Sequence, residues 1–124
     1  MHYQGKDYFA EYSPFYVDDE TNYFRLHVSN YSGTAGDALL TLNHQGFGSK
    51  SDGMAFSTID NDHDATNSNC AFLFDSGWWF NNCFGGNLNG LWGAHKNWEG
   101  LNWHPLTGIS SGIDFSEMKL RVKH

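Results

Sequence analysis

Apolar and polar residues alternate along the first third of the chain in the way that half-buried β-strands do. The alternation covers residues 8–12, 15–17 and 24–28, and in the last of these Arg25 and His27 lie on the polar face. At least two antiparallel strands are therefore expected. The same alternation returns in residues 115–122, which predicts a closing strand with one buried face that joins the main sheet.

Regular structure is expected to be sparse between these runs. Residues 35–40 are consistent with one or two helical turns, and they precede a loop rich in Gly and Ser at residues 46–51. From Gly53 onward Gly, Asn, Asp and Ser recur every few positions, which is typical of long ordered loops. The sequence thus predicts an α+β fold with a small antiparallel sheet, short helices and a large loop-rich part.

The composition fits a single folded domain. The chain has 124 residues, with 17% aromatic residues and only two prolines, which is far from the profile of a disordered chain. Its net charge of -7 would repel a phosphate backbone or an anionic membrane, so nucleic acid is not an expected partner. No apolar run approaches the roughly 18 residues of a membrane span, and the start at Met1 lacks the features of a signal peptide.

Two cysteines, Cys70 and Cys83, lie in a stretch rich in Gly and Asn. Such a pair suits one disulfide better than a metal site, with two buried free thiols as the alternative. A ring of this size would stabilise the fold by about 3 kcal/mol in the chain-entropy model. A disulfide needs an oxidising compartment, so the pair indicates secretion. The glycosylation triplet Asn30-Tyr31-Ser32 is weaker evidence for the same compartment.

An acidic loop precedes the first cysteine. Asp60, Asp62 and Asp64 alternate with other polar residues, so that carboxylate and carbonyl oxygens can converge on one calcium ion. An EF-hand does not fit, because Ala65 stands where that loop needs glycine and Ala71 where it needs glutamate. A solvated acidic turn is the remaining alternative.

The order of the motifs resembles that of a known family. The acidic loop is followed by the first cysteine, Gly77-Trp78-Trp79, the second cysteine and Asn87-Leu88-Asn89-Gly90. This order resembles the C-terminal fibrinogen-like domain of fibrinogen chains, ficolins and tachylectins, and residues 31–39, 53–58 and 117–121 are similar to further family segments. Family domains are usually longer, and their opening subdomain has no counterpart before Met1. The resemblance therefore implies that residues 1–124 are the C-terminal portion of such a domain.

The resemblance implies a calcium-binding subdomain in the acidic loop. The expected ligands are the carboxylates of Asp62 and Asp64 and the main-chain carbonyls of Thr66 and Ser68. Asp60 would lie behind these ligands, and His63 would lie between them with its ring exposed. Magnesium is disfavoured, because carbonyls at irregular spacing suit a larger ion with less strict geometry.

The resemblance also implies a ligand pocket beside the second cysteine. In family lectins this cysteine follows a cis peptide bond, here Asn82–Cys83, and the N–H groups of Cys83 and Phe84 would face the carbonyl oxygen of an acetyl group. Phe84, Trp98 and Phe72 would provide apolar walls for its methyl group. Three further tryptophans are assigned to core packing: Trp78, Trp79 and Trp103.

The function that this resemblance implies is secreted, calcium-dependent recognition of acetylated (N-acetyl) sugars or bacterial cell-wall glycans in innate immunity. The alternative is a protein- or peptide-binding module of the fibrinogen or angiopoietin kind, in which acidic residues capture a cationic peptide. Phe74 and Phe84 stand where such pockets carry Asp and His, which favours the lectin, and Asp75 is the nearby acidic residue. Homo-oligomers would raise the avidity of shallow sites, and uncovered strand edges could pair between chains.

An enzyme is not expected. The sequence contains no Ser/His/Asp order and no H-E-x-x-H or G-x-S-x-G string. His44, His95 and His104 could bind zinc, but their spacing supports no particular site.

Overall fold

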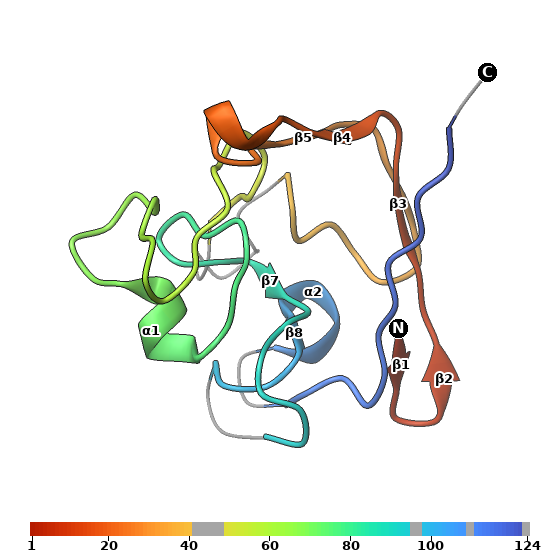
Figure 1. The fold of residues 1–124 in the computed structure, drawn as a ribbon. Coiled ribbons are helices and arrows are strands. Elements are labelled where there is room, and N and C mark those ends of the chain that lie inside the picture. Colours follow the sequence, from red (N-terminus) through yellow and green to blue (C-terminus); the bar gives the residue numbers. More distant parts are fainter. Residues whose placement is uncertain (41–48, 95–97, 109–110, 123–124) are drawn as a thin grey trace.

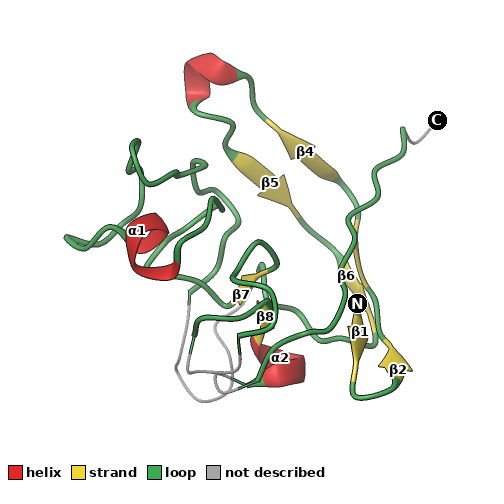
Figure 2. Ribbon diagram, turned by 60° about the horizontal axis from the view of Figure 1, so that its bottom comes forward, coloured by secondary structure: helices red, strands yellow, loops and turns green. Residues whose placement is uncertain are grey.

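The computed structural model describes residues 1–40, 49–94, 98–108 and 111–122. Within them the strands form two-stranded antiparallel sheets and the helices are short (Figures 1 and 2). His44, His95 and residues 46–48 of the expected Gly- and Ser-rich loop lie outside the described residues. The elements in chain order are β1 (His2–Tyr3), β2 (Lys6–Asp7), β3 (Ala10–Tyr12), β4 (Phe15–Val17), the 3₁₀-helix η1 (Glu20–Asn22), β5 (Leu26–Val28), β6 (Tyr31–Gly33), α1 (Cys70–Phe74), β7 (Gly86–Asn87), β8 (Asn102–Trp103) and α2 (His104–Thr107).

Two hairpin halves near the start of the chain form one bent ribbon. β3 pairs with β6, and β4 pairs with β5. The ribbon bends where β3 passes into β4 through the cis Ser13–Pro14 bond. Two backbone hydrogen bonds hold this corner, from Ser13 N to Ser29 O at 3.0 Å and from Ser29 N to Pro14 O at 3.2 Å. The prediction of at least two antiparallel strands in the first third is confirmed.

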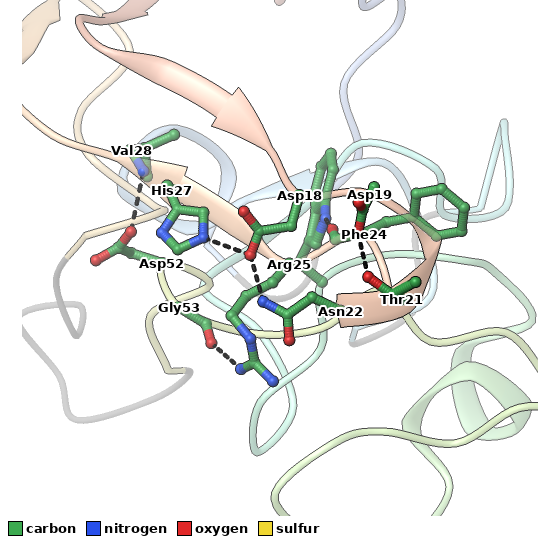
Figure 3. Close-up of polar contacts among 11 residues, drawn as sticks. Asp18, Asp19, Thr21, Asn22, Phe24, Arg25, His27, Val28, Asp52 and Gly53 are labelled. Carbon is green, nitrogen blue, oxygen red and sulfur yellow. Dashed lines mark hydrogen bonds and ion pairs between the residues drawn. The ribbon is translucent and has the colours of Figure 1, made fainter.

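Polar side chains stabilise the β4–β5 hairpin and connect it to the segment at Asp52 and Gly53 (Figure 3). The Asp18 carboxylate accepts a hydrogen bond from Asn22 Nδ2 and lies 2.8 Å from His27 Nε2. The His27 contact is the main reason that the pKa of Asp18 lies below its usual range. Asp52 Oδ1 accepts from the N–H of Val28 at 2.9 Å. The Asp18 contacts thus hold the hairpin together, and the Asp52 contact connects it to the segment that leads into the acidic loop.

The core is built largely from aromatic side chains of the second half of the chain. Its largest fully buried members are Trp78, Trp103, Phe80, Phe84 and Leu26. Buried indole N–H groups need acceptors: Trp103 Nε1 donates to Gly36 O at 2.7 Å and Trp79 Nε1 to Phe24 O at 2.9 Å. The assignment of Trp78, Trp79 and Trp103 to core packing is confirmed.

The helical turns expected at residues 35–40 are not formed. Asp37 Oδ1 accepts hydrogen bonds from the N–H groups of Leu39 and Leu40, both at 3.0 Å, and the segment contains bends only. A short carboxylate that bonds nearby N–H groups stabilises such local turns in competition with a helix. The described helices, α1 and α2, lie elsewhere, at residues 70–74 and 104–107.

The closing strand expected at residues 115–122 is also wrong. Phe115 forms an isolated bridge with His2, and residues 116–122 are not in a strand. The apolar side chains of Met118, Leu120 and Val122 are 49%, 72% and 80% exposed. Alternation shows which face a strand would bury, but the described residues offer this segment no paired strand edge.

The long ordered loops expected after Gly53 are confirmed, since residues 53–69 contain only isolated bridges and turns. No helix of the described residues is long and apolar enough to span a membrane.

Candidate functional site

The acidic loop is shaped by side chains that bond the backbone two residues ahead. Asp62 Oδ1 accepts from Asp64 N and Asp64 Oδ1 from Thr66 N, each at 3.0 Å, and Thr66 Oγ1 accepts from Ser68 N at 3.3 Å. Asp, Ser and Thr commonly form such turns. The side chains of three of the four residues expected to bind calcium therefore shape the loop.

Asp64 also connects the loop to the disulfide. Its second oxygen, Oδ2, accepts from the N–H of Cys70 at 2.9 Å, at the start of α1. Asn69 is the N-cap of this helix, and its side chain accepts from Phe72 N at 3.0 Å. The acidic loop and the first helix are thus held together by side-chain oxygens.

The electrostatics of the loop suit a hard cation. Burial raises the pKa of Asp64, and the neighbouring Asp62 carboxylate raises it further, because two like charges disfavour ionisation. Among the described residues no Lys, Arg or His forms an ion pair with either carboxylate. The same residues contain no group of three His, Cys, Asp or Glu side chains that could hold a metal ion. An ion at this loop would need carbonyl oxygens in addition to the two carboxylates, as the expected ligand set has.

His63 is not exposed as expected. Its ring stacks on Tyr23 with centroids 4.1 Å apart, and its ring Nε2 is buried without a hydrogen-bond partner among the described residues. The backbone N–H of His63 donates to Ser57 Oγ at 2.9 Å. Asp60 bonds the Thr58 hydroxyl at 2.7 Å, which lowers the pKa of Asp60.

The disulfide and the cis peptide bond are both present. Cys70 and Cys83 are joined by an S–S bond of 2.04 Å, and the Asn82–Cys83 peptide is cis. Ala65 N donates to Asn81 O at 3.1 Å, which connects the acidic loop directly to this turn. Within the described part of the chain, the N–H groups of Cys83 and Phe84 have no hydrogen-bond acceptor. Cys83 is half-buried, so its N–H can face a ligand beside the ring, whereas Phe84 is fully buried and its N–H is closed off from solvent.

Phe84 lies at the centre of an aromatic cluster and is 0% exposed. Its ring centroid lies 5.0 Å from Phe74, 5.6 Å from Trp98, 5.6 Å from His104 and 5.9 Å from Phe80. The Phe84 side chain therefore does not line an open pocket, as was expected, but packs against Phe74 and Trp98 in the core. These two rings are half-buried.

Phe72 is separate from this cluster. It is 68% exposed on α1 and has no ring contact with another described residue. The sequence could not show this, because only the helix formed at residues 70–74 turns Phe74 inward and Phe72 outward.

The sequence matches the family described as fibrinogen beta and gamma chains, C-terminal globular domain, over residues 1–123. This chain belongs to that family. Among relatives of this fibrinogen-like domain, human tenascin-R is 41% identical over 113 residues, which are 91% of this chain and 8% of tenascin-R. Human fibrinogen C domain-containing protein 1 is 44% identical over 110 residues, which are 86% of this chain and 22% of that protein.

Solved structures agree with the assignment. The fibrinogen-like globe domain of human ANGPTL2 is similar with a TM-score of 0.78 and 35% identity, covering 91% of this chain and 50% of that chain. The lamprey fibrin D-dimer complexed with the peptide Gly-His-Arg-Pro-amide has a TM-score of 0.79 and 28% identity, covering 91% and 40%. This fibrinogen-like domain thus spans half or less of the chains it matches.

Sequence reasoning did not place His104 in the site of this fibrinogen-like domain. Its ring packs on Trp98 at 4.5 Å as well as on Phe84. Pro105 is the available signal, because proline is favoured in the first turn of a helix and here marks the start of α2.

Proposed function

We propose that this domain is a secreted recognition module that holds calcium in the acidic loop and binds acetylated carbohydrate beside the disulfide. The observation that carries the proposal is the N–H of the half-buried Cys83, which has no acceptor among the described residues and lies directly after the cis bond, joined to the acidic loop. Backbone donors of this kind suit a ligand carbonyl oxygen. The disulfide supports an oxidising compartment.

Calcium would be held by the carboxylates of Asp62 and Asp64 and the carbonyls of Thr66 and Ser68. No N–H of the described residues donates to these two carbonyls, so they are available to an ion. A bound cation offsets the repulsion that raises the pKa of Asp64. Because Asp64 also bonds Cys70, the charge would be fixed next to the ring.

An acetyl group would bind with its carbonyl oxygen towards the N–H of Cys83, which is half-buried. Trp98 and Phe74 are half-buried, so part of each ring remains accessible to the methyl group or to the apolar face of a sugar. Asn82 is exposed, and its side-chain amide would be available to sugar hydroxyls. No catalytic role is proposed, since these groups can bind and orient a ligand but include no activated nucleophile.

Peptide binding is the second candidate, and Asp75 supports it. This exposed residue is the C-cap of α1, directly after Phe74, and has a left-handed backbone conformation. The lamprey fibrin structure with its peptide ligand and the similarity to tenascin-R fit this reading. The apolar Phe74–Phe84 contact gives a cationic peptide fewer charged partners, so the carbohydrate reading is preferred.

Calorimetry with three probes separates these readings. N-acetylglucosamine, glucosamine and Gly-His-Arg-Pro-amide are titrated into the domain in calcium and in chelator. The proposal expects binding of N-acetylglucosamine alone, weakened in chelator and lost in Trp98→Leu. The matched control is Trp92→Leu, because Trp92 is a 75% exposed tryptophan outside the cluster.

Each other outcome is informative. Binding of the peptide alone, reduced in Asp75→Asn, would replace the carbohydrate proposal with the peptide one. If glucosamine bound as tightly as N-acetylglucosamine, the acetyl group would not be what the domain recognises. Equal loss in the Trp92 and Trp98 variants would show that the aromatic cluster is not the site.

A further inference from the structure

The turn between β5 and β6 carries Asn30-Tyr31-Ser32, which is the one Asn-x-Ser/Thr triplet in the sequence. Asn30 and Ser32 are exposed, whereas Tyr31 between them is half-buried. The Tyr31 ring lies 5.7 Å from that of Tyr12, and its hydroxyl accepts from Gly36 N at 2.8 Å. Because neighbouring side chains of a strand point to opposite faces, a Tyr31 held against the domain directs Ser32 outward.

Asn30 also suits the turn itself. Its φ is 51°, in the left-handed region that asparagine adopts more readily than most other residues. Its Nδ2 donates to Ser13 O at 2.8 Å, across the corner where the ribbon bends. These two features explain an asparagine at position 30, but neither of them requires a serine at position 32.

The amide of Asn30 keeps a second N–H group. A side-chain amide has two N–H donors, so a sugar can replace one hydrogen while the other maintains the contact with Ser13. The neighbouring surface is open as well, since Ser32 pairs with the exposed Glu11 of β3, and Pro14 is exposed. The turn can therefore carry a bulky group without a change in the strand pairing.

The corner is remote from the proposed ligand site. The β4–β5 hairpin contacts the acidic loop at its η1 end, where Tyr23 stacks on His63. Asn30 follows the other end of the hairpin, and in Figures 1 and 2 this corner lies well away from α1. A group attached at Asn30 would thus leave the acidic loop and the disulfide accessible.

We propose that Asn30 carries an N-linked oligosaccharide. The donor is an oligosaccharide joined through N-acetylglucosamine to a lipid pyrophosphate, in the compartment that also forms the Cys70–Cys83 disulfide. Asn30 Nδ2 forms a bond to C1 of the sugar and loses one proton. The bond from C1 to the pyrophosphate oxygen breaks, and its electron pair leaves with the lipid pyrophosphate, so nothing is oxidised or reduced. This inference rests on the secreted location in the proposed function, but not on its calcium or carbohydrate site.

Production of the chain behind a cleavable signal sequence in animal cells tests the proposal. Intact mass spectrometry should show a wild type that is heavier by an oligosaccharide. Digestion with peptide N-glycosidase should remove this mass and convert Asn30 to aspartate. Asn30→Gln and Ser32→Ala should each abolish the added mass, whereas Ser32→Thr should keep it, because threonine also completes the triplet.

Asn67→Gln is the matched control. Asn67 is also exposed, but the residue two positions after it is Asn69 rather than Ser or Thr, so this variant should keep the added mass. Ser32→Ala retains the Asn30 side chain and its contact with Ser13, so its result does not depend on a disturbed turn. Formation of the disulfide shows that each variant entered the oxidising compartment.

The outcomes separate this inference from the proposed function. A disulfide-bonded wild type without added mass would overturn the glycan and leave secretion standing. An added mass that persists in Ser32→Ala would overturn the assignment to Asn30. A glycosylated domain that binds neither calcium nor N-acetylglucosamine would support the glycan and refute the proposed function alone.

Discussion

Asp64 and Asp62 are two residues apart in the acidic loop, yet in chelator their removal should have different effects on stability. Asp64→Ala removes the acceptor of two N–H groups, those of Thr66 and the fully buried Cys70. Asp62→Ala removes one acceptor, for Asp64 N, at an exposed position. It also removes the charge that disfavours ionised Asp64.

The magnitudes follow from these contacts. A hydrogen bond to a charged group contributes about 1.5–3 kcal/mol, and a buried donor left unpaired costs about 1–3 kcal/mol. The substitution also removes a partly buried carboxylate that the Asp62 charge repels, which offsets part of this loss. Asp64→Ala should therefore lower the free energy of unfolding by about 2–3 kcal/mol. Asp62→Ala should remain within about 0.5 kcal/mol of wild type, because a lost exposed hydrogen bond and a relieved repulsion oppose each other.

The assay is urea unfolding followed by tryptophan fluorescence, with each protein in chelator and then in calcium. Calcium should stabilise the wild type and Asp60→Ala, whose carboxylate bonds only the Thr58 hydroxyl and its own turn. It should stabilise neither the Asp62 nor the Asp64 variant. Equal losses for Asp62→Ala and Asp64→Ala in chelator would refute the separate roles, and calcium stabilisation of Asp62→Ala would refute its role as a ligand.

Four further changes test the fold. Gly90→Ala should lower the free energy of unfolding by about 2 kcal/mol or more, because the added Cβ would lie 2.0 Å from Gly100 O. Gly93→Ala should lower it by only about 1 kcal/mol, because Gly93 has a φ of +81° but no atom within 4 Å of the added Cβ. Urea unfolding measures both changes. Reduction of the disulfide should lower stability by about 3 kcal/mol, measured with and without reductant. The contact with His27 lowers the pKa of Asp18 in the folded protein. The ionised Asp18 therefore stabilises the fold above its usual pKa of 3.8, and this stabilisation is lost as the pH falls through the lower folded pKa. The difference in melting temperature between wild type and Asp18→Asn should accordingly shrink below about pH 4.

Much of the local structure could be predicted from the sequence, because short-range patterns determined it. The alternation at residues 8–28 gave the bent ribbon, and the spacing of Cys70 and Cys83 suited the disulfide that forms. Residues 115–122 show the limit of that reasoning. Their alternation is as regular as that of residues 24–28, but a strand also requires a neighbouring edge, and a pattern within one segment carries no information about its neighbour.

The sequence predicted the order of the candidate site residues along the chain, but not how deeply each side chain is buried. A phenylalanine beside a cysteine can line a pocket or fill the core, and four surrounding rings bury Phe84. Sequence spacing likewise placed His63 between the expected ligands with its ring exposed, whereas its ring is stacked on Tyr23 and partly buried. In both cases the deciding contacts come from residues far along the chain or on separate loops.

The acidic loop and the disulfide ring form one closed circuit of contacts. Asp64 bonds the N–H of Cys70, the disulfide joins Cys70 to Cys83, and Asn81, two residues before Cys83, accepts from Ala65, which follows Asp64. If the proposed cation binds at Asp64 and the proposed ligand beside Cys83, this circuit is the path by which one could affect the other. Any factor by which the cation changes the ligand's affinity must then equal the factor by which the ligand changes the cation's affinity.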